Sequence, residues 1–102
     1  MGSRERLAKK PSSAVPLNLL RAFEATARHM SMKEAAAELN LTPSAISYRV
    51  SLLEKILQCK LQQKIGARLT LTEAGDRLLA GLKIGFAHIT QAVDTLRGSA
   101  KR

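Results

Sequence analysis

Hydroxyl, phenol and ammonium groups recur between residues 42 and 55 at spacings that would gather them on one side of a helix. At 100° per residue, Ser44, Ser47, Tyr48, Ser51 and Lys55 share one face, and the opposite face carries Ile46, Val50, Leu53 and Leu57. Small hydroxyls can hydrogen-bond to base edges, and an ammonium can pair with a phosphate. The pattern predicts a helix that packs its apolar face on a core and offers its polar face to a DNA major groove. An ordinary solvated surface is the alternative interpretation.

The start of this helix has the residue types that begin helices. Thr42 can cap the first turn through its side-chain oxygen, and Pro43 suits the first helical position because a missing amide hydrogen costs nothing there. Arg49 lies beside the polar face, where it would reach a phosphate or a guanine, or cover the edge of the core. We therefore expect a helix over residues 42–57 whose candidate DNA-binding residues are Thr42, Pro43, Ser44, Ser47, Tyr48, Arg49, Ser51 and Lys55.

Two shorter helices are expected to hold this one in place. Asn18 is expected to cap the first helix, which ends at His29 and Met30, and Leu19, Leu20, Phe23 and Ala27 share its apolar face. Ser31 and Glu34 form a capping-box pattern that starts the second helix. Asn40 tolerates the left-handed backbone of a tight turn. Two helices joined by such a turn make a helix-turn-helix.

The segment from Leu61 to Leu71 changes to a strand-like pattern. Two short strands, 61–65 and 68–71, are expected on either side of Gly66 and Ala67. Lys60 lies just before this segment, Lys64 and Arg68 fall in it, and no acidic residue lies between Gln58 and Thr72. Lys64 and Arg68 are therefore candidate contacts to the DNA backbone or to a narrow minor groove. Scattered cations that keep a hairpin soluble are the alternative interpretation.

A long helix is expected over residues 72–97, capped by Thr72 and ended by Gly98 and Ser99. Its apolar residues follow the four-three spacing of a coiled-coil seam: Gly75, Leu79, Leu82, Phe86, Ile89, Val93 and Leu96. The rest of the domain can cover Gly75 and Leu79, but the stretch from Phe86 to Leu96 is expected to lie beyond its reach. A second copy is the expected cover, with a dimer interface of Leu79, Leu82, Phe86, Ile89, Val93 and Leu96.

Composition favours one small, mainly helical domain whose partner is a nucleic acid or another anionic surface. The 102 residues carry a net charge of +9, and aromatic residues make up only 3% of them. Residues 1–16 are expected to form a mobile basic arm, and residues 98–102 a short tail. No apolar run approaches the roughly 20 residues that cross a bilayer, and no signal peptide is recognisable, so a cytoplasmic location and no membrane partner are expected.

The chain offers no recognisable catalytic or metal-binding pattern. Cys59 is the only cysteine and cannot form an internal disulfide, and neither His29 nor His88 lies near it in sequence. Glu34 and Glu38 share a helix face but are expected to be solvated. We expect a protein that is not an enzyme and needs neither cofactor nor metal.

In its sequence motifs the chain resembles the DNA-binding domain of LysR-type transcriptional regulators. The resemblance covers about residues 17–97 and depends on LRAFEA, on AAAELNLTPSAIS, on the pair Leu53-Glu54 and on LTEAG. It implies a winged helix-turn-helix followed by a linker helix that pairs two subunits antiparallel. It also implies dimers or tetramers that bind an interrupted inverted repeat near a promoter, and hence a protein associated with the bacterial nucleoid. Five residues would then face bases and phosphates: Thr42, Pro43, Ser44, Ser47 and Tyr48.

The chain departs from the family pattern where it enters the hairpin. Gln58 stands where the family commonly has glycine, and Gln62 replaces a usual buried phenylalanine. Gln63 and Ser51 each stand where a cation is frequent. A buried glutamine without partners would cost about 1–3 kcal/mol, so Gln62 is expected to be hydrogen-bonded or partly exposed.

Two functional hypotheses follow. The first is sequence-specific binding of double-stranded DNA by a dimeric LysR-type regulator, with residues 42–57 in the major groove and 61–71 on the backbone or minor groove. The second rests on length, because the chain has no room for the C-terminal ligand-sensing domain of the family and hence no small-molecule effector site. The chain is then expected to be either an N-terminal fragment or a free-standing module. In that hypothesis a free-standing module pairs through 72–97 with a full-length LysR-type partner and modulates it. Nonspecific binding of RNA through the basic arm is disfavoured by the scarcity of aromatic residues, and binding of membranes by Asp94 among the cations of the final helix.

Overall fold

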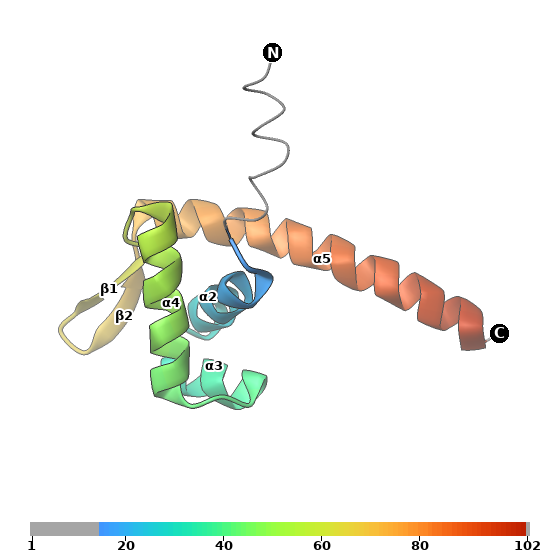
Figure 1. Ribbon diagram of the computed structural model, residues 1–102, viewed down its shortest axis with the longest axis horizontal. Helices are drawn as coiled ribbons and strands as arrows, with labels where there is room; N and C mark the ends of the chain where they lie inside the picture. Colours follow the sequence, from blue (N-terminus) through green and yellow to red (C-terminus); the bar gives the residue numbers. More distant parts are fainter. Residues whose placement is uncertain (1–14, 102) are drawn as a thin grey trace, which may run out of the picture.

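The computed structural model describes residues 15–101, so most of the predicted basic arm, residues 1–14, lies outside the described residues. Three helices are followed by a hairpin and a long helix (Figure 1): α2 Leu17–His29, α3 Met32–Leu39, α4 Pro43–Leu57, β1 Gln62–Ile65, β2 Arg68–Leu71 and α5 Glu73–Lys101. The predicted fold class, mainly α with a small β-hairpin and a long final helix, is confirmed.

Local capping explains where the helices begin and end. The Ser31 hydroxyl accepts a hydrogen bond of 3.0 Å from the Glu34 amide, and the Thr42 hydroxyl accepts one of 3.1 Å from the Ala45 amide. Asn40 adopts the expected left-handed backbone, with φ 58°. The prediction for Asn18 is wrong, because α2 already begins at Leu17 after Pro16 and has no side-chain cap.

The core lies where α2, α3 and α4 meet. Phe23, Ile46, Val50 and Leu53 are buried there, and Leu61 joins them from the start of the hairpin. Buried alanines of α2 and α3 permit the close approach of these two helices: Ala22, Ala25, Ala35 and Ala36. The core prediction for Leu57 is wrong: this residue ends α4, where the chain turns away at Gln58, and is 36% exposed.

Ionic contacts join α2 to α3 on the surface. Arg28 donates hydrogen bonds of 2.8 Å to both Glu24 and Glu38, and His29 lies 2.7 Å from Glu38. The contact with Arg28, and next that with His29, lower the pKa of the Glu38 carboxyl to about 2. Because the partners are partly exposed, this cluster orients the two helices more than it stabilises the fold.

The hairpin is antiparallel, and its register pairs Gln62 with Leu71 and Ile65 with Arg68. Gly66 has φ 66° in the turn, a left-handed conformation in which glycine pays no steric cost. The first strand begins at Gln62, one residue later than predicted, because Leu61 belongs to the core. Gln62 is partly exposed, as predicted, but its Oε1 is buried and has no partner among the described residues.

The last helix is longer than predicted. Thr72 accepts a hydrogen bond of 3.0 Å from the Gly75 amide at its start, and α5 then continues to Lys101. Gly98 and Ser99 do not end it, since a glycine inside a helix costs only about 1 kcal/mol. In Figure 1, α5 passes α2 and then runs away from the other elements. None of the helices in residues 15–101 has the length and apolar character to cross a membrane.

Candidate nucleic-acid interface

The polar face of α4 points outward, opposite the core. Tyr48 is 67% exposed, and Ser44, Ser51 and Lys55 are exposed as well. Ser47 and Arg49 are half-buried at the borders of this face. The buried Ile46, Val50 and Leu53 hold the helix from behind. Folding therefore leaves the hydroxyls, the phenol and the ammonium of α4 available to a partner.

The first turn of α4 combines a structural and an exposed hydroxyl. The Thr42 side chain caps the helix and lies 3.3 Å from the Ser44 hydroxyl, so part of its hydrogen-bonding capacity is already used. Pro43 and Ser44 are exposed beside it. Helix N-termini favour phosphate groups because their amides point at the ligand and the helix dipole is positive there.

A cleft of about 180 Å³ separates α4 from the hairpin. Ser47 and Ser51 line it from α4, and Lys64 lines it from β1, so the structure brings these three predicted residues together. Figure 1 shows the hairpin projecting beside α4. The register pairs Lys64 with Leu69 and the exposed Arg68 with Ile65, so Arg68 lies on the other face of the hairpin and does not line the cleft. Lys55 is exposed on α4 but does not line the cleft. Hydroxyls and cations therefore occupy the helix and the hairpin on either side of one groove.

Glu54 is the residue of this region whose role the sequence did not reveal. Its carboxylate accepts hydrogen bonds from the backbone amides of Leu61 (2.8 Å) and Gln62 (3.3 Å), and Lys60 lies 3.5 Å away. Helix periodicity could not expose this contact, because the chain reverses at Gln58 between the two partners. In the sequence, Leu53 and Glu54 stand out only as part of the motif that resembles the LysR family.

Metal-binding side chains do not gather in residues 15–101. No group of three or more histidine, cysteine or acidic residues in this part of the chain could hold a metal ion. His29 contacts Glu38, and Cys59 is exposed near the end of α4.

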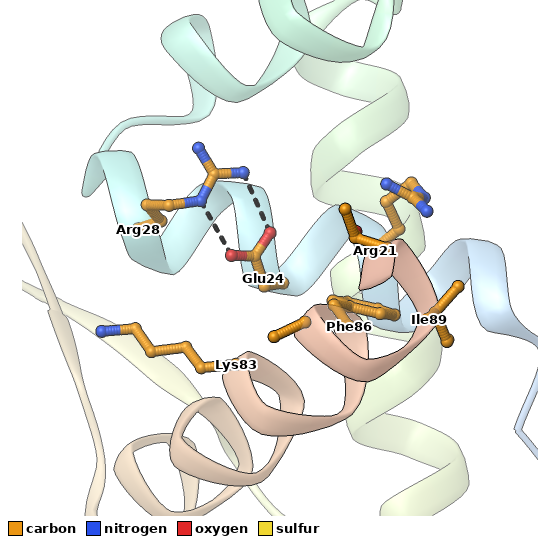
Figure 2. Close-up of a pocket in the computed structure, with 8 residues that line it drawn as sticks. Arg21, Glu24, Arg28, Lys83, Phe86 and Ile89 are labelled. Atoms are coloured by element: carbon orange, nitrogen blue, oxygen red, sulfur yellow. Dashed lines mark hydrogen bonds and ion pairs between the residues drawn. The ribbon is translucent and has the colours of Figure 1, made fainter. Parts of the chain in front are cut away.

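The rest of the domain covers the apolar seam of α5 over a longer stretch than predicted, as far as Phe86. Leu79 and Leu82 pack against the core, and the Arg21 guanidinium lies 5.3 Å from the centre of the Phe86 ring. Figure 2 shows Phe86 facing α2 across a groove of about 320 Å³, with Glu24 and Lys83 at its sides. The expectation that the domain cannot reach Phe86 is therefore wrong. Ile89, Val93 and Leu96 remain exposed, by 48%, 41% and 72%.

Known proteins with similar sequences are transcriptional regulators. The family model described as "Bacterial regulatory helix-turn-helix protein, lysR family" matches residues 17–76. The HTH-type transcriptional activator AmpR of Yersinia enterocolitica is 48% identical over 82 residues, which cover 80% of this chain and 28% of AmpR. The glycine cleavage system transcriptional activator of Escherichia coli K12 is 38% identical over 87 residues, 85% of this chain and 28% of that protein. The chain thus spans less than a third of the length of these relatives.

Solved structures share the fold. A BenM DNA-binding domain in complex with catB site 1 DNA has a TM-score of 0.76 at 22% identity, over 86% of this chain and 99% of that one. A probable transcriptional regulator of Pseudomonas aeruginosa, PA0477, has a TM-score of 0.75 at 29% identity, over 81% of this chain and 28% of that one. The family model matches more than half of the chain, and these structures share its winged helix-turn-helix fold, so this chain belongs to the LysR family of bacterial helix-turn-helix regulators.

Proposed function

We propose that this chain binds a specific double-stranded DNA sequence as a dimer and thereby regulates transcription. The observation that carries the proposal is the outward polar face of α4, with Tyr48 67% exposed above a buried row of Ile46, Val50 and Leu53. An α-helix fits the major groove, where each base pair presents a distinct pattern of donors and acceptors. Ser44, Ser47 and Tyr48 would read that pattern, while Thr42 mainly caps the helix.

The hairpin would add affinity without much sequence information. Lys64 and Arg68 are exposed near its turn, and Lys64 lines the cleft next to Ser47 and Ser51. Cations that reach phosphates strengthen binding to every sequence and release counterions. Arg49 and Lys55 at the edges of the polar face would contact the backbone in the same way. With α4 seated in the major groove, the hairpin would follow the adjacent backbone or minor groove.

Pairing through α5 would supply the second half of the site. Ile89, Val93 and Leu96 form an exposed apolar row on a helix that extends past its own domain. A second copy that packs its own α5 on this row would bury it and would carry a second α4. Two α4 helices related by a two-fold axis read an interrupted inverted repeat, and two such dimers would form a tetramer. Binding to chromosomal DNA would place the protein in the bacterial cytoplasm.

Selection of bound duplexes from a random pool, followed by footprinting of the selected sequence, tests this proposal. We expect Tyr48→Ala and Ser47→Ala to reduce the preference for the selected duplex over a random duplex by about tenfold, since a base contact contributes about 1–3 kcal/mol of discrimination. Lys64→Ala and Arg68→Ala serve as matched controls on the hairpin. They should weaken both duplexes similarly and lower the slope of log affinity against log salt by about 1 each.

The contrary outcome is clear. If selected and random duplexes compete equally for the wild-type protein at moderate salt, α4 does not read sequence. Basic charge alone would then explain any binding.

A further inference from the structure

Three elements meet at the short segment from Lys60 to Gln62, at the base of the hairpin. On one side, the Glu54 carboxylate of α4 accepts hydrogen bonds of 2.8 Å and 3.3 Å from the amides of Leu61 and Gln62. The Lys60 ammonium lies 3.5 Å from the other oxygen of the same carboxylate. Only 11% of the Glu54 side chain is exposed, so water screens its bonds to the two amides little, whereas Lys60 is 79% exposed and its ion pair is screened.

The start of α5 holds the same segment from the other side. The Thr72 hydroxyl donates a hydrogen bond of 2.6 Å to the Lys60 carbonyl, and the Thr72 amide donates one of 3.0 Å to the Leu61 carbonyl. Gly75 then packs directly against the backbone of Leu61. The base of the hairpin is thus fixed to α4 through a carboxylate and to α5 through a threonine.

Beyond this base, little holds the hairpin to α4. Gln63, Lys64 and Ile65 of β1 are all exposed. The Oε1 atom of Gln62 is buried without a partner among the described residues, so this amide oxygen anchors nothing. The Leu61 side chain anchors the start of the hairpin in the core, and Leu71 of β2 packs against the same core. The two amide bonds to Glu54 are the hydrogen bonds that join the start of the hairpin directly to α4.

We propose that Glu54 is a positioning residue for DNA binding, which orients the hairpin relative to α4 so that both reach one duplex together. The inference rests on the proposed function, because it assigns the hairpin a share of DNA binding. Without the carboxylate, the amides of Leu61 and Gln62 lose their acceptor and the hairpin can tilt. Contacts of Lys64 and Arg68 would then no longer add to those of α4.

Charge predicts the opposite result, which makes the test sharp. Removal of an acidic group from a DNA-binding domain should strengthen binding to a polyanion. We expect Glu54→Ala to weaken binding to the selected duplex by about tenfold instead, and Glu54→Gln, which keeps an oxygen acceptor, to weaken it less. Glu34→Ala removes the same charge from an exposed position on α3 and should leave binding unchanged or slightly stronger.

A double-mutant cycle separates positioning from general damage. In a background that carries both Lys64→Ala and Arg68→Ala, Glu54→Ala should have almost no further effect, because the hairpin contacts are already lost. In a Tyr48→Ala background its full effect should persist. Equal losses in both backgrounds, or tighter binding by the Glu54 variants, would overturn the proposal.

Amide hydrogen exchange tests the joint between Glu54 and the hairpin, which is formed by the amides of Leu61 and Gln62, in the absence of DNA. In Glu54→Ala, the Leu61 and Gln62 amides should exchange at least tenfold faster, while those of Val50 and Leu53 in α4 stay protected. Unchanged protection of Leu61 and Gln62 would refute the role of Glu54 even if the variant bound DNA poorly. Failure of the wild-type protein to prefer any duplex would refute the proposed function instead, and the exchange result would still report on the joint.

Discussion

The ends of α2, α3 and α4 each require a residue with left-handed backbone. Met30, Asn40 and Gln58 occupy these positions, with φ 52°, 58° and 59°. Asparagine tolerates this conformation, but a residue with an ordinary side chain pays a steric cost of roughly 1–2 kcal/mol there. Gln58 therefore carries a steric cost at this position. Its amide nevertheless closes α4 by bonding to the carbonyls of Glu54 and Lys55.

Replacement of Gln58 by glycine should stabilise the protein. We expect Gln58→Gly to raise the free energy of unfolding by about 1 kcal/mol, because glycine adopts the left-handed conformation without steric cost. Urea denaturation followed by circular dichroism would measure the change. Asn40→Gly is the matched control and should alter stability less, since asparagine already tolerates its φ of 58°. A destabilised Gln58→Gly protein would mean that the glutamine side chain contributes more than its backbone costs.

At the scale of elements, the first turn of α5 decides how closely the hairpin approaches. Gly75 is buried, and a Cβ atom built on it would overlap the carbonyl oxygen of Leu61. That carbonyl also accepts the 3.0 Å hydrogen bond from the Thr72 amide. Because the backbone fixes the position of a Cβ atom and the Leu61 oxygen is itself a backbone atom, no side-chain rotation can relieve the overlap. The absence of a side chain at Gly75 is thus what permits this helix to start against this strand.

We expect Gly75→Ala to destabilise the fold by about 1–3 kcal/mol through overpacking. Thermal and urea unfolding at matched protein concentration would measure the loss. Gly81 provides an internal control in the same helix, because a Cβ atom there meets nothing within 4 Å. Gly81→Ala should stabilise the helix by about 0.5–1 kcal/mol, the usual gain of alanine over glycine. Equal effects of the two substitutions would contradict the tight contact with Leu61.

At the scale of the whole molecule, a small domain carries a helix that outreaches it. Figure 1 shows α5 along one edge of the domain, with its far end beyond the other elements. Arg21 and the core cover the seam of α5 as far as Phe86, and the exposed apolar residues follow beyond. The groove beside Phe86 is bordered by Ile89, so the covered and exposed parts of the seam are continuous.

Ile89→Glu should convert the proposed dimer into a monomer. A carboxylate at an apolar contact would weaken pairing at least about 100-fold, which corresponds to about 3 kcal/mol. Analytical ultracentrifugation would show the change in mass, and the protected DNA would shrink to one half-site. Gln91→Glu is the control: it adds the same charge to an exposed position about 200° around the helix and should leave the dimer intact. A wild-type protein that sediments as a monomer at high concentration would refute pairing through α5.

The same exposed row would serve a mixed dimer with a full-length LysR-type protein. Co-expression of the two chains, with Ile89→Glu as the control, distinguishes that hypothesis from self-pairing. The absence of a mixed species would argue against it.

The sequence alone determined what depends on neighbours three or four residues away. Apolar and polar periodicity predicted the buried and exposed faces of α4, with the exception of Leu57 at its last turn. The helix boundaries were predicted from Ser31, Asn40 and Thr42, because capping and left-handed turns depend on local side chains and backbone. The family motifs indicated the fold for the same reason, because each motif consists of residues that lie close together in the sequence.

Only the tertiary structure decided how the elements lie against one another. The contact of Glu54 with Leu61, the burial of the Gln62 oxygen and the cover of Phe86 by Arg21 all depend on the angles between α4, the hairpin and α5. No periodicity encodes those angles, because they arise from packing between residues that are distant in sequence or separated by a chain reversal. The end of α5 also differs from the prediction, because the helix continues through Gly98 in spite of the low helix propensity of glycine.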